Sequence, residues 1–275
     1  MTFSGVLRAE FVKLFSTRLW WVLALILFVY VAATAGILAG VFGGLSDQVA
    51  AQGGNAPQVP PGELHLIVYS VASTVGYVFP VLLGALATTS EFRHQTLTPT
   101  FLASPRRGGV LTAKLIVMAI VGAGFGAVSL LASIGLGAPI LAATGNDAAL
   151  GAEDTWLLVG RLLLAMALWA VIGVGLGVLI PSQVAAIVVV LAFTQFVEPI
   201  LRAAASVWDW TAEVGQFLPG AASDALVGSS IFTSLAAGPT AARMLDWWQG
   251  GLVLLGIAVV AAAVGYLTSW RSDVT

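Results

Sequence analysis

The sequence predicts an all-α integral membrane protein that forms a single transmembrane domain over residues 1–275. Hydrophobic residues make up 59% of the chain and charged residues only 9%, and the mean hydropathy is +0.99. Ordinary proteins carry about 25% charged residues. The apolar residues also form long continuous runs, unlike the alternating segments of about 10 residues in a membrane β-barrel. These observations exclude a soluble enzyme and a disordered chain, and the absence of Cys excludes a disulfide scaffold.

Six apolar runs are long enough to cross a bilayer, which takes about 20 residues in a helix. They extend from Leu19 to Leu45, Leu66 to Ser90, Leu115 to Ala143, Trp156 to Ile180, Val184 to Ile200 and Trp247 to Trp270. Glycines and Pro139 interrupt the third run, so we expect this helix to be kinked or tilted.

The distribution of charge predicts the orientation of the chain, because Lys and Arg concentrate on the cytoplasmic side of membrane proteins. Here 8 of the 11 Lys and Arg residues fall on one predicted side, and 10 of the 13 Asp and Glu residues fall on the other. The basic set is Arg8, Lys13, Arg18, Arg93, Arg106, Arg107, Lys114 and Arg271. Both termini are therefore predicted to be cytoplasmic, in a multi-pass protein of the cell membrane. Three loops would face outward: residues 46–63, 144–155 and 205–246.

Several kinds of catalytic chemistry are not expected. A P-loop needs a Gly-Lys-Ser/Thr sequence, and neither Lys13 nor Lys114 stands in one. His65 and His94 fall on opposite predicted sides, so they cannot form a metal-binding pair. We therefore expect no catalytic residue, no cofactor and no metal in this chain, and no nucleic acid as a partner. The Asp and Glu residues lie outside the predicted spans or near their ends, which argues against a proton relay and an intramembrane enzyme.

Residues 1–18 are predicted to form an amphipathic helix at the inner membrane interface. Phe3, Leu7, Phe11 and Leu14 follow one another at steps of four, four and three, which places them on one helical face. Such a helix lies in the interface plane with its basic residues towards the lipid headgroups.

The sequence EFRHQTLTPTFLASPRRGGVLTAK, residues 91–114, is the only sizeable predicted cytoplasmic loop. Pro99 and Pro105 favour one or two short helices over a continuous one. A short segment that mixes apolar and charged residues suits docking into a groove on a cytoplasmic partner. The alternative is a basic loop that only determines topology, but that role would not require Phe101 or the proline spacing, so we favour docking.

Two further patterns each allow two interpretations. Glu198 and Arg202 are four residues apart at the outer end of the fifth run, where they could form a structural ion pair or a gate for substrate. Three Gly-x-x-x-Gly sequences lie within the runs, starting at Gly36, Gly122 and Gly173. They could form a dimerisation face or the wall of a transport path, or they could allow close packing of helices within one chain.

The chain resembles the permeases of ABC-2 type transporters. The resemblance is carried by Glu10-x-x-Lys13 followed by Ser16-Thr17-Arg18, and by the loop from Glu91 through Thr96-Leu97 to Ser104-Pro105-Arg106-Arg107 and Lys114. Six spans, cytoplasmic termini and a tight Pro181-Ser182-Gln183 turn also match, so the resemblance covers essentially the whole chain.

The resemblance implies the membrane subunit of an ATP-binding-cassette exporter, which works as a homo- or heterodimer with separate ATPase subunits that bind ATP and Mg. It implies a coupling helix within residues 91–106, short re-entrant helices within residues 205–246, and a path involving the second and fifth spans. The ATPase-coupling residues would be Glu91, Phe92, Arg93, His94, Thr96, Leu97, Phe101, Arg106, Arg107, Glu10 and Lys13. An apolar path would suit drugs, lipids or hydrophobic peptides. The alternative function is an ion-coupled secondary transporter or a channel.

Overall fold

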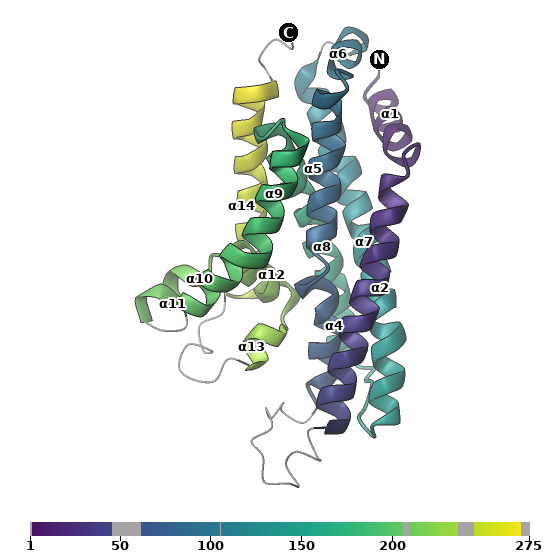
Figure 1. The fold of residues 1–275 in the computed structure, drawn as a ribbon, viewed down its shortest axis with the longest axis vertical. Coiled ribbons are helices and arrows are strands. Elements are labelled where there is room, and N and C mark those ends of the chain that lie inside the picture. The colour runs from purple at the N-terminus through teal and green to yellow at the C-terminus, as the bar shows by residue number, and fades with distance from the viewer. Residues whose placement is uncertain (1, 46–61, 105, 206–208, 236–244, 271–275) are drawn as a thin grey trace.

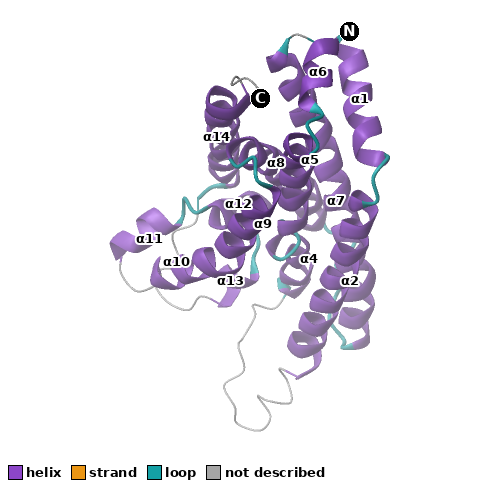
Figure 2. Ribbon diagram, turned by 45° about the horizontal axis from the view of Figure 1, so that its top comes forward, coloured by secondary structure: helices purple, strands orange, loops and turns teal. Residues whose placement is uncertain are grey.

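The computed structural model describes residues 2–45, 62–104, 106–205, 209–235 and 245–270, and in these ranges the chain forms helices and no strands (Figures 1 and 2). The α-helices are α1 (Phe3–Phe15), α2 (Leu19–Gly40), α4 (Leu64–Thr74), α5 (Val78–Arg93), α6 (Leu97–Ala103), α7 (Arg107–Ala143), α8 (Glu153–Leu179), α9 (Gln183–Ala192), α10 (Glu198–Ala205), α11 (Asp209–Gly215), α12 (Pro219–Val227), α13 (Ile231–Leu235) and α14 (Trp247–Gly265). Three π-helical turns extend them: η1 (Val41–Leu45), η2 (Phe193–Val197) and η4 (Tyr266–Trp270).

Six helical segments in the described residues are long and apolar enough to cross a membrane, which confirms the all-helical fold class and is compatible with a multi-pass membrane protein. They are Leu19–Gly44, Leu64–Arg93, Arg107–Ala143, Glu153–Leu179, Gln183–Ala205 and Trp247–Trp270. Each coincides with one of the six predicted runs. Of the three predicted outward loops, the first lies almost entirely outside the described residues, as do parts of the third and the predicted basic residue Arg271.

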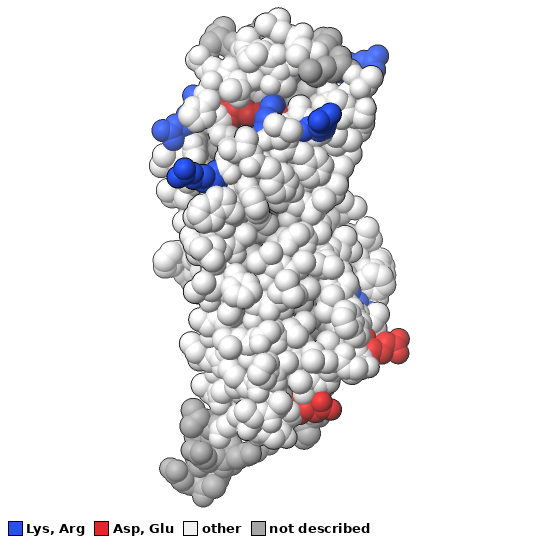
Figure 3. All heavy atoms as spheres, turned by 90° about the vertical axis from the view of Figure 1, so that its right-hand side faces the viewer, with Lys and Arg blue, Asp and Glu red and all other residues white. Residues whose placement is uncertain are grey.

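The helix α8 is at the centre of the bundle, where it contacts α4, α5, α7, α12 and α14 (Figure 1). The short helices α1 and α6 lie together at one end of the molecule, which we call the α1–α6 end. The short helices α10 to α13 lie further down, with α12 about halfway along the long axis and against the lower end of α14. In the space-filling view of Figure 3, basic residues gather near the α1–α6 end, and a broad uncharged belt separates them from acidic residues below.

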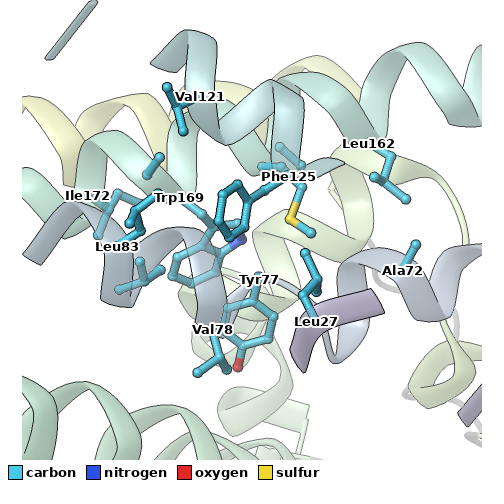
Figure 4. Packing of buried hydrophobic residues seen from close by; sticks show 14 of the residues in the cluster. Leu27, Ala72, Tyr77, Val78, Leu83, Val121, Phe125, Leu162, Trp169 and Ile172 are labelled. Carbon is cyan, nitrogen blue, oxygen red and sulfur yellow. The ribbon is translucent and has the colours of Figure 1, made fainter. Parts of the chain in front are cut away.

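The second span is broken into α4 and α5, a feature that the apolar run from Leu66 to Ser90 did not predict. Pro80 has no backbone N–H and so cannot donate to the carbonyl of Gly76 as an α-helix requires. The Phe79 N–H instead donates to that carbonyl at 3.1 Å, which makes a tighter turn. The break positions Tyr77 so that its ring stacks on Trp169 of α8, with ring centroids 4.4 Å apart (Figure 4).

The third span remains one helix of 37 residues although Pro139 lies inside it. At about 1.5 Å per residue, a helix of this length is longer than the hydrocarbon core of a bilayer, which is about 30 Å thick.

Most of the paired glycines allow close contacts between helices of this one chain. A Cβ at Gly122 of α7 would lie 2.6 Å from the Cβ of Ala170 in α8. A Cβ at Gly173 of α8 would collide with the backbone carbonyl of Val81 in α5. Gly177, Gly126 and Gly36 also face neighbouring helices, whereas a Cβ at Gly40 would have no atom within 4 Å. The geometry therefore favours packing within the chain for most of these glycines.

Candidate functional site

Four charged residues from three helices meet near the α1–α6 end, and we call them the lysine–glutamate cluster: Glu10, Lys13, Glu91 and Lys114. Lys13 Nζ lies 2.7 Å from Glu10 Oε1 and 2.8 Å from Glu91 Oε1. Lys114 Nζ lies 2.6 Å from Glu10 Oε2 and 3.3 Å from Glu91 Oε1. Each carboxylate thus contacts both ammonium groups, and the cluster is neutral when all four residues are ionised.

The packing of α1 explains why Glu10 is inside. Val6, Glu10 and Leu14 are spaced four residues apart, so they share one helical face, and all three are buried. That face lies against α7, which provides Lys114. Glu91 comes from the last turn of α5, and Lys13 from the side of α1, where its side chain remains 38% exposed. Of the predicted apolar face, Leu14 is buried, Leu7 and Phe11 are half-buried and Phe3 is exposed.

The charges in the cluster favour the ionised forms of both α1 residues. Burial by itself raises the pKa of Glu10, but the charges of and hydrogen bonds from Lys114 and Lys13 outweigh it and lower the pKa below the ordinary value. Burial likewise opposes the charge of Lys13, but Glu91 and Glu10 raise the pKa of its ammonium group above the ordinary value. A buried charge is tolerated when such partners surround it, whereas an unpaired one is very costly.

A cavity of about 340 Å³ borders the cluster. Glu10, Lys13, Glu91 and Lys114 all line it, together with His94 and several apolar residues of α1, α5 and α7. Glu91 Oε2 is buried and has no hydrogen-bond partner among the described residues. Space and an unused acceptor therefore lie side by side at the point where α1, α5 and α7 meet.

The helix α6 is held against the ends of the long helices by aromatic contacts. The ring of Trp270 in η4 packs edge-on against Phe92 of α5 and Phe101 of α6, at centroid distances of 5.9 and 5.6 Å. The Trp270 indole N–H donates to the carbonyl of Arg107 at 3.1 Å, and the Arg107 guanidinium lies over the Phe101 ring. Lys13 also donates to the Thr100 hydroxyl at 3.3 Å, which links α1 to α6.

The predicted coupling residues divide into three groups by exposure. Arg93, His94, Thr96 and Arg106 are exposed, whereas Glu10, Glu91 and Leu97 are buried, and Phe92, Phe101, Arg107 and Lys13 are half-buried. The buried residues have little surface to offer a partner, and the half-buried residues Phe92, Phe101 and Arg107 make the contacts that hold α6. Leu102, which lies on α6 but outside the predicted set, is 82% exposed. Pro99 is in the first turn of α6, where the missing N–H has no helical acceptor to satisfy.

A second charged group surrounds Glu198 and Arg202. The predicted pair is present, with Arg202 Nε 3.4 Å from Glu198 Oε1, but Arg202 Nη1 lies closer to Asp224 Oδ2, at 2.6 Å. Ser230 also donates to Asp224 Oδ2, and the backbone N–H of Gly220 donates to Glu198 Oε1. The sequence placed Asp224 in the outward segment of residues 205–246, where the resemblance implies a re-entrant helix over residues 221–226. In the structure α12 folds back against α8 and α14, so Asp224 is only 4% exposed.

Lys114, Thr100 and Asp224 are the partners that the sequence reasoning missed. The sequence did contain a hint of Lys114. The chain has only two Lys residues, Lys13 and Lys114, and both fall on the same predicted side of the membrane. Asp224 stands within the largely apolar stretch PGAASDALVG, a pattern that also fits a buried helix. The short helices α11 and α12 lie in the ranges 208–217 and 221–226, where the resemblance implies re-entrant helices, and Trp208 lies outside the described residues.

The fold is a helical bundle that has, among the described residues, six helices long and apolar enough to cross a membrane, and ion pairs with buried carboxylates join its helices. A scan of the chain against models of known protein families finds no match, and a search of curated proteins finds no similar sequence. The resemblance to ABC-2 type permeases rests on the residue pattern of the chain itself. What that resemblance implies for function is argued next as a proposal.

Proposed function

We propose that this chain is the transmembrane permease subunit of an ATP-binding-cassette exporter, which moves substrate outward with energy from a separate ATPase subunit. The observation that supports it best is α6. This helix has an outer surface with the exposed side chain of Leu102, and its inner side packs on Trp270 and contacts Lys13 through Thr100. A displacement of α6 by a partner would therefore be transmitted to α1, α5 and α14 together.

The lysine–glutamate cluster suits such a role because it connects several helices through short contacts. Lys13 joins α1 to α5, and Lys114 joins α7 to both of them. Arg93 adds a further link, because its guanidinium donates to Gln183 Oε1 at the start of α9 at 3.0 Å. Displacement of α6 by a partner would act on the whole terminal part of the bundle rather than on one loop.

The rest of the proposal follows from the resemblance to ABC-2 type permeases. The chain would lie in the cell membrane with both termini cytoplasmic, and it would pair with a second permease chain, identical or different. ATP and Mg would bind to the partner ATPase, so the chain itself would not be an enzyme and would contain no cofactor or metal. The partner would contact the exposed residues Arg93, His94, Thr96, Leu102 and Arg106.

Copurification from membranes in a mild detergent tests the proposal. We expect a P-loop ATPase to copurify with the native chain and to be lost on Leu102→Asp, which places a charge on the exposed surface of α6. Leu150→Asp is the matched control, because Leu150 is also exposed but lies between α7 and α8 at the opposite end. Transport by the purified chain without an ATPase, or equal ATPase recovery from both variants, would refute the proposal.

An ion-coupled secondary transporter or channel is the second candidate. The group of Glu198, Arg202 and Asp224, whose two carboxylates are buried, favours it, since ionisable residues inside the membrane often mark ion pathways. In reconstituted vesicles this function predicts transport that stops when the ion gradient is collapsed and that needs no ATP. The exporter predicts the reverse dependence.

A further inference from the structure

A cavity of about 170 Å³ lies where η2 and α10 approach α12 and the break between α4 and α5. Its wall is mostly aromatic and polar, and the residues that matter below are Tyr30, Tyr77, Glu198, Arg202, Asp224 and Phe232. Tyr30 and Phe232 are about half exposed, so the wall of the cavity reaches the surface of the molecule.

Only one of the two carboxylate oxygens of Glu198 accepts hydrogen bonds from the described residues. Oε1 accepts from the Gly220 N–H and from Arg202, whereas Oε2 is buried and has no hydrogen-bond partner among the described residues. The hydroxyl of Tyr77 is near enough to interact with this carboxylate, but its hydrogen bond goes to the carbonyl of Thr194, at 3.4 Å. A buried acceptor without a partner costs free energy, and a donor that enters the cavity would recover it.

The charges around the cavity do not balance. Glu198 and Asp224 contribute two carboxylates, and Arg202 is the one cation among the residues that line the cavity. Arg202 makes its shorter contact with Asp224, which leaves Glu198 as the carboxylate with the weaker partner. Two carboxylates therefore share one cation, and a second positive charge in the cavity would pair with Glu198 and favour its ionised form. The ligand that fits this arrangement is a cation.

We propose that this cavity binds a protonated primary amine that carries an apolar group, with the ammonium against Glu198 Oε2 and the apolar group against Tyr30 and Tyr77. Aromatic faces attract cations, and Phe232 already lies under the guanidinium of Arg202. An amine N–H can donate to the free oxygen, which a quaternary ammonium cannot do.

An organic cation fits this wall better than a metal ion. Calcium takes six to eight oxygen ligands and magnesium needs near-octahedral oxygen coordination. Among the described residues, no three His, Asp or Glu side chains come together in the way that a metal ion requires. One free carboxylate oxygen beside aromatic rings is instead typical of sites that hold an ammonium group.

The proposal requires no ATPase, so it can be tested on the purified full-length chain in nanodiscs by isothermal titration calorimetry. The probe is benzylamine, which is protonated at neutral pH. We expect saturable binding that is at least about tenfold weaker for Glu198→Gln, because the amide offers the ammonium group a neutral acceptor in place of a charged one. The matched control is Glu153→Gln, an equal change at an exposed residue of α8, and it should leave the affinity within about twofold.

Two related compounds separate charge from ring. Benzyl alcohol keeps the ring without the charge, and benzyltrimethylammonium keeps the charge without an N–H; both should bind more weakly than benzylamine. If Glu198→Gln does not fold, Tyr30→Leu tests the proposal instead, since Tyr30 is 46% exposed and its replacement should not disturb the fold. Loss of this aromatic ring should weaken benzylamine binding about threefold. Absence of saturable binding, equal binding of benzyl alcohol, or unchanged affinity in the deciding variant would overturn the proposal. None of these results would affect copurification of an ATPase.

Discussion

Lys114 Nζ lies 2.6 Å from Glu10 Oε2, although the two residues are 104 positions apart in the chain. Both side chains are about 4% exposed. This contact joins the short helix α1 to the third span, and through Lys13 and Glu91 it extends to the second span. We therefore expect the loss of this contact to destabilise the packing of α1, α5 and α7 at the α1–α6 end.

Replacing Lys114 by Met should destabilise the protein by about 3 kcal/mol or more, because it leaves buried carboxylates with one cation in place of two. The free energy of unfolding in detergent, from denaturant titration, measures this. Arg18→Met is the control: Arg18 is exposed just before α2, so its loss should stay within about 0.5 kcal/mol. Adding Glu10→Gln to Lys114→Met should cost less than the sum of the two single changes, and strict additivity would show that the pair does not interact.

The cluster should also make stability depend on pH. Because the pKa of Glu10 is lowered in the folded state, its contribution is present above the ordinary value of 4.5 and is lost as the pH falls through the folded value. Melting temperatures from about pH 7 down to about pH 3 should therefore converge for the native chain and Glu10→Gln. A constant gap between the two curves at all pH values would contradict the assignment.

The raised pKa of Lys13 makes stability depend on pH in the opposite direction. Its contribution is complete below the ordinary value of 10.5 and is lost only as the pH rises through the folded value. We therefore expect the native chain to keep its stability advantage over Lys13→Met up to about pH 10 and to lose it in stronger alkali. Loss of the advantage near neutral pH would show that Lys13 is not held by Glu91 and Glu10.

Gly173→Ala should destabilise the protein by about 1–3 kcal/mol, because the new methyl group meets the Val81 carbonyl and must separate α5 from α8. Gly160→Ala on the same helix has no atom within 4 Å and should be neutral or slightly stabilising. Thermal unfolding of both variants checks this. If Gly173→Ala were as stable as the native chain but changed its oligomeric state, the dimerisation interpretation of this glycine would be favoured instead.

Trp270→Ala should loosen α6 without unfolding the bundle. It removes the ring between Phe92 and Phe101 and the hydrogen bond to the Arg107 carbonyl. We expect trypsin to cut at Arg93 or Arg106 several-fold faster in this variant, because local opening exposes the backbone to protease. Trp21→Ala, at a half-exposed residue of α2, should leave the cleavage rate unchanged. Equal rates for both variants would show that Trp270 does not hold α6.

Local chemistry was enough to predict the six spans. A run of about 20 apolar residues is favourable in a bilayer whatever the rest of the chain does, and its helical hydrogen bonds are all internal. The spacing of Glu198 and Arg202 predicted their ion pair for the same reason, since four residues make about one helical turn. The break at Pro80 was not predicted, although its cause is also local, because the apolar run continues through the proline.

The tertiary structure decided which distant residues meet. Nothing in the sequence joined Glu10 to Lys114 or Arg202 to Asp224, because these contacts depend on how the helices pack and not on spacing along one helix. Glu10 is buried although it lies on a short helix at one end of the bundle, and Asp224 is buried although it lies in the segment between the fifth and sixth spans. In both places a charge enters the bundle because partners of opposite charge compensate its burial, and only the packed structure provides them.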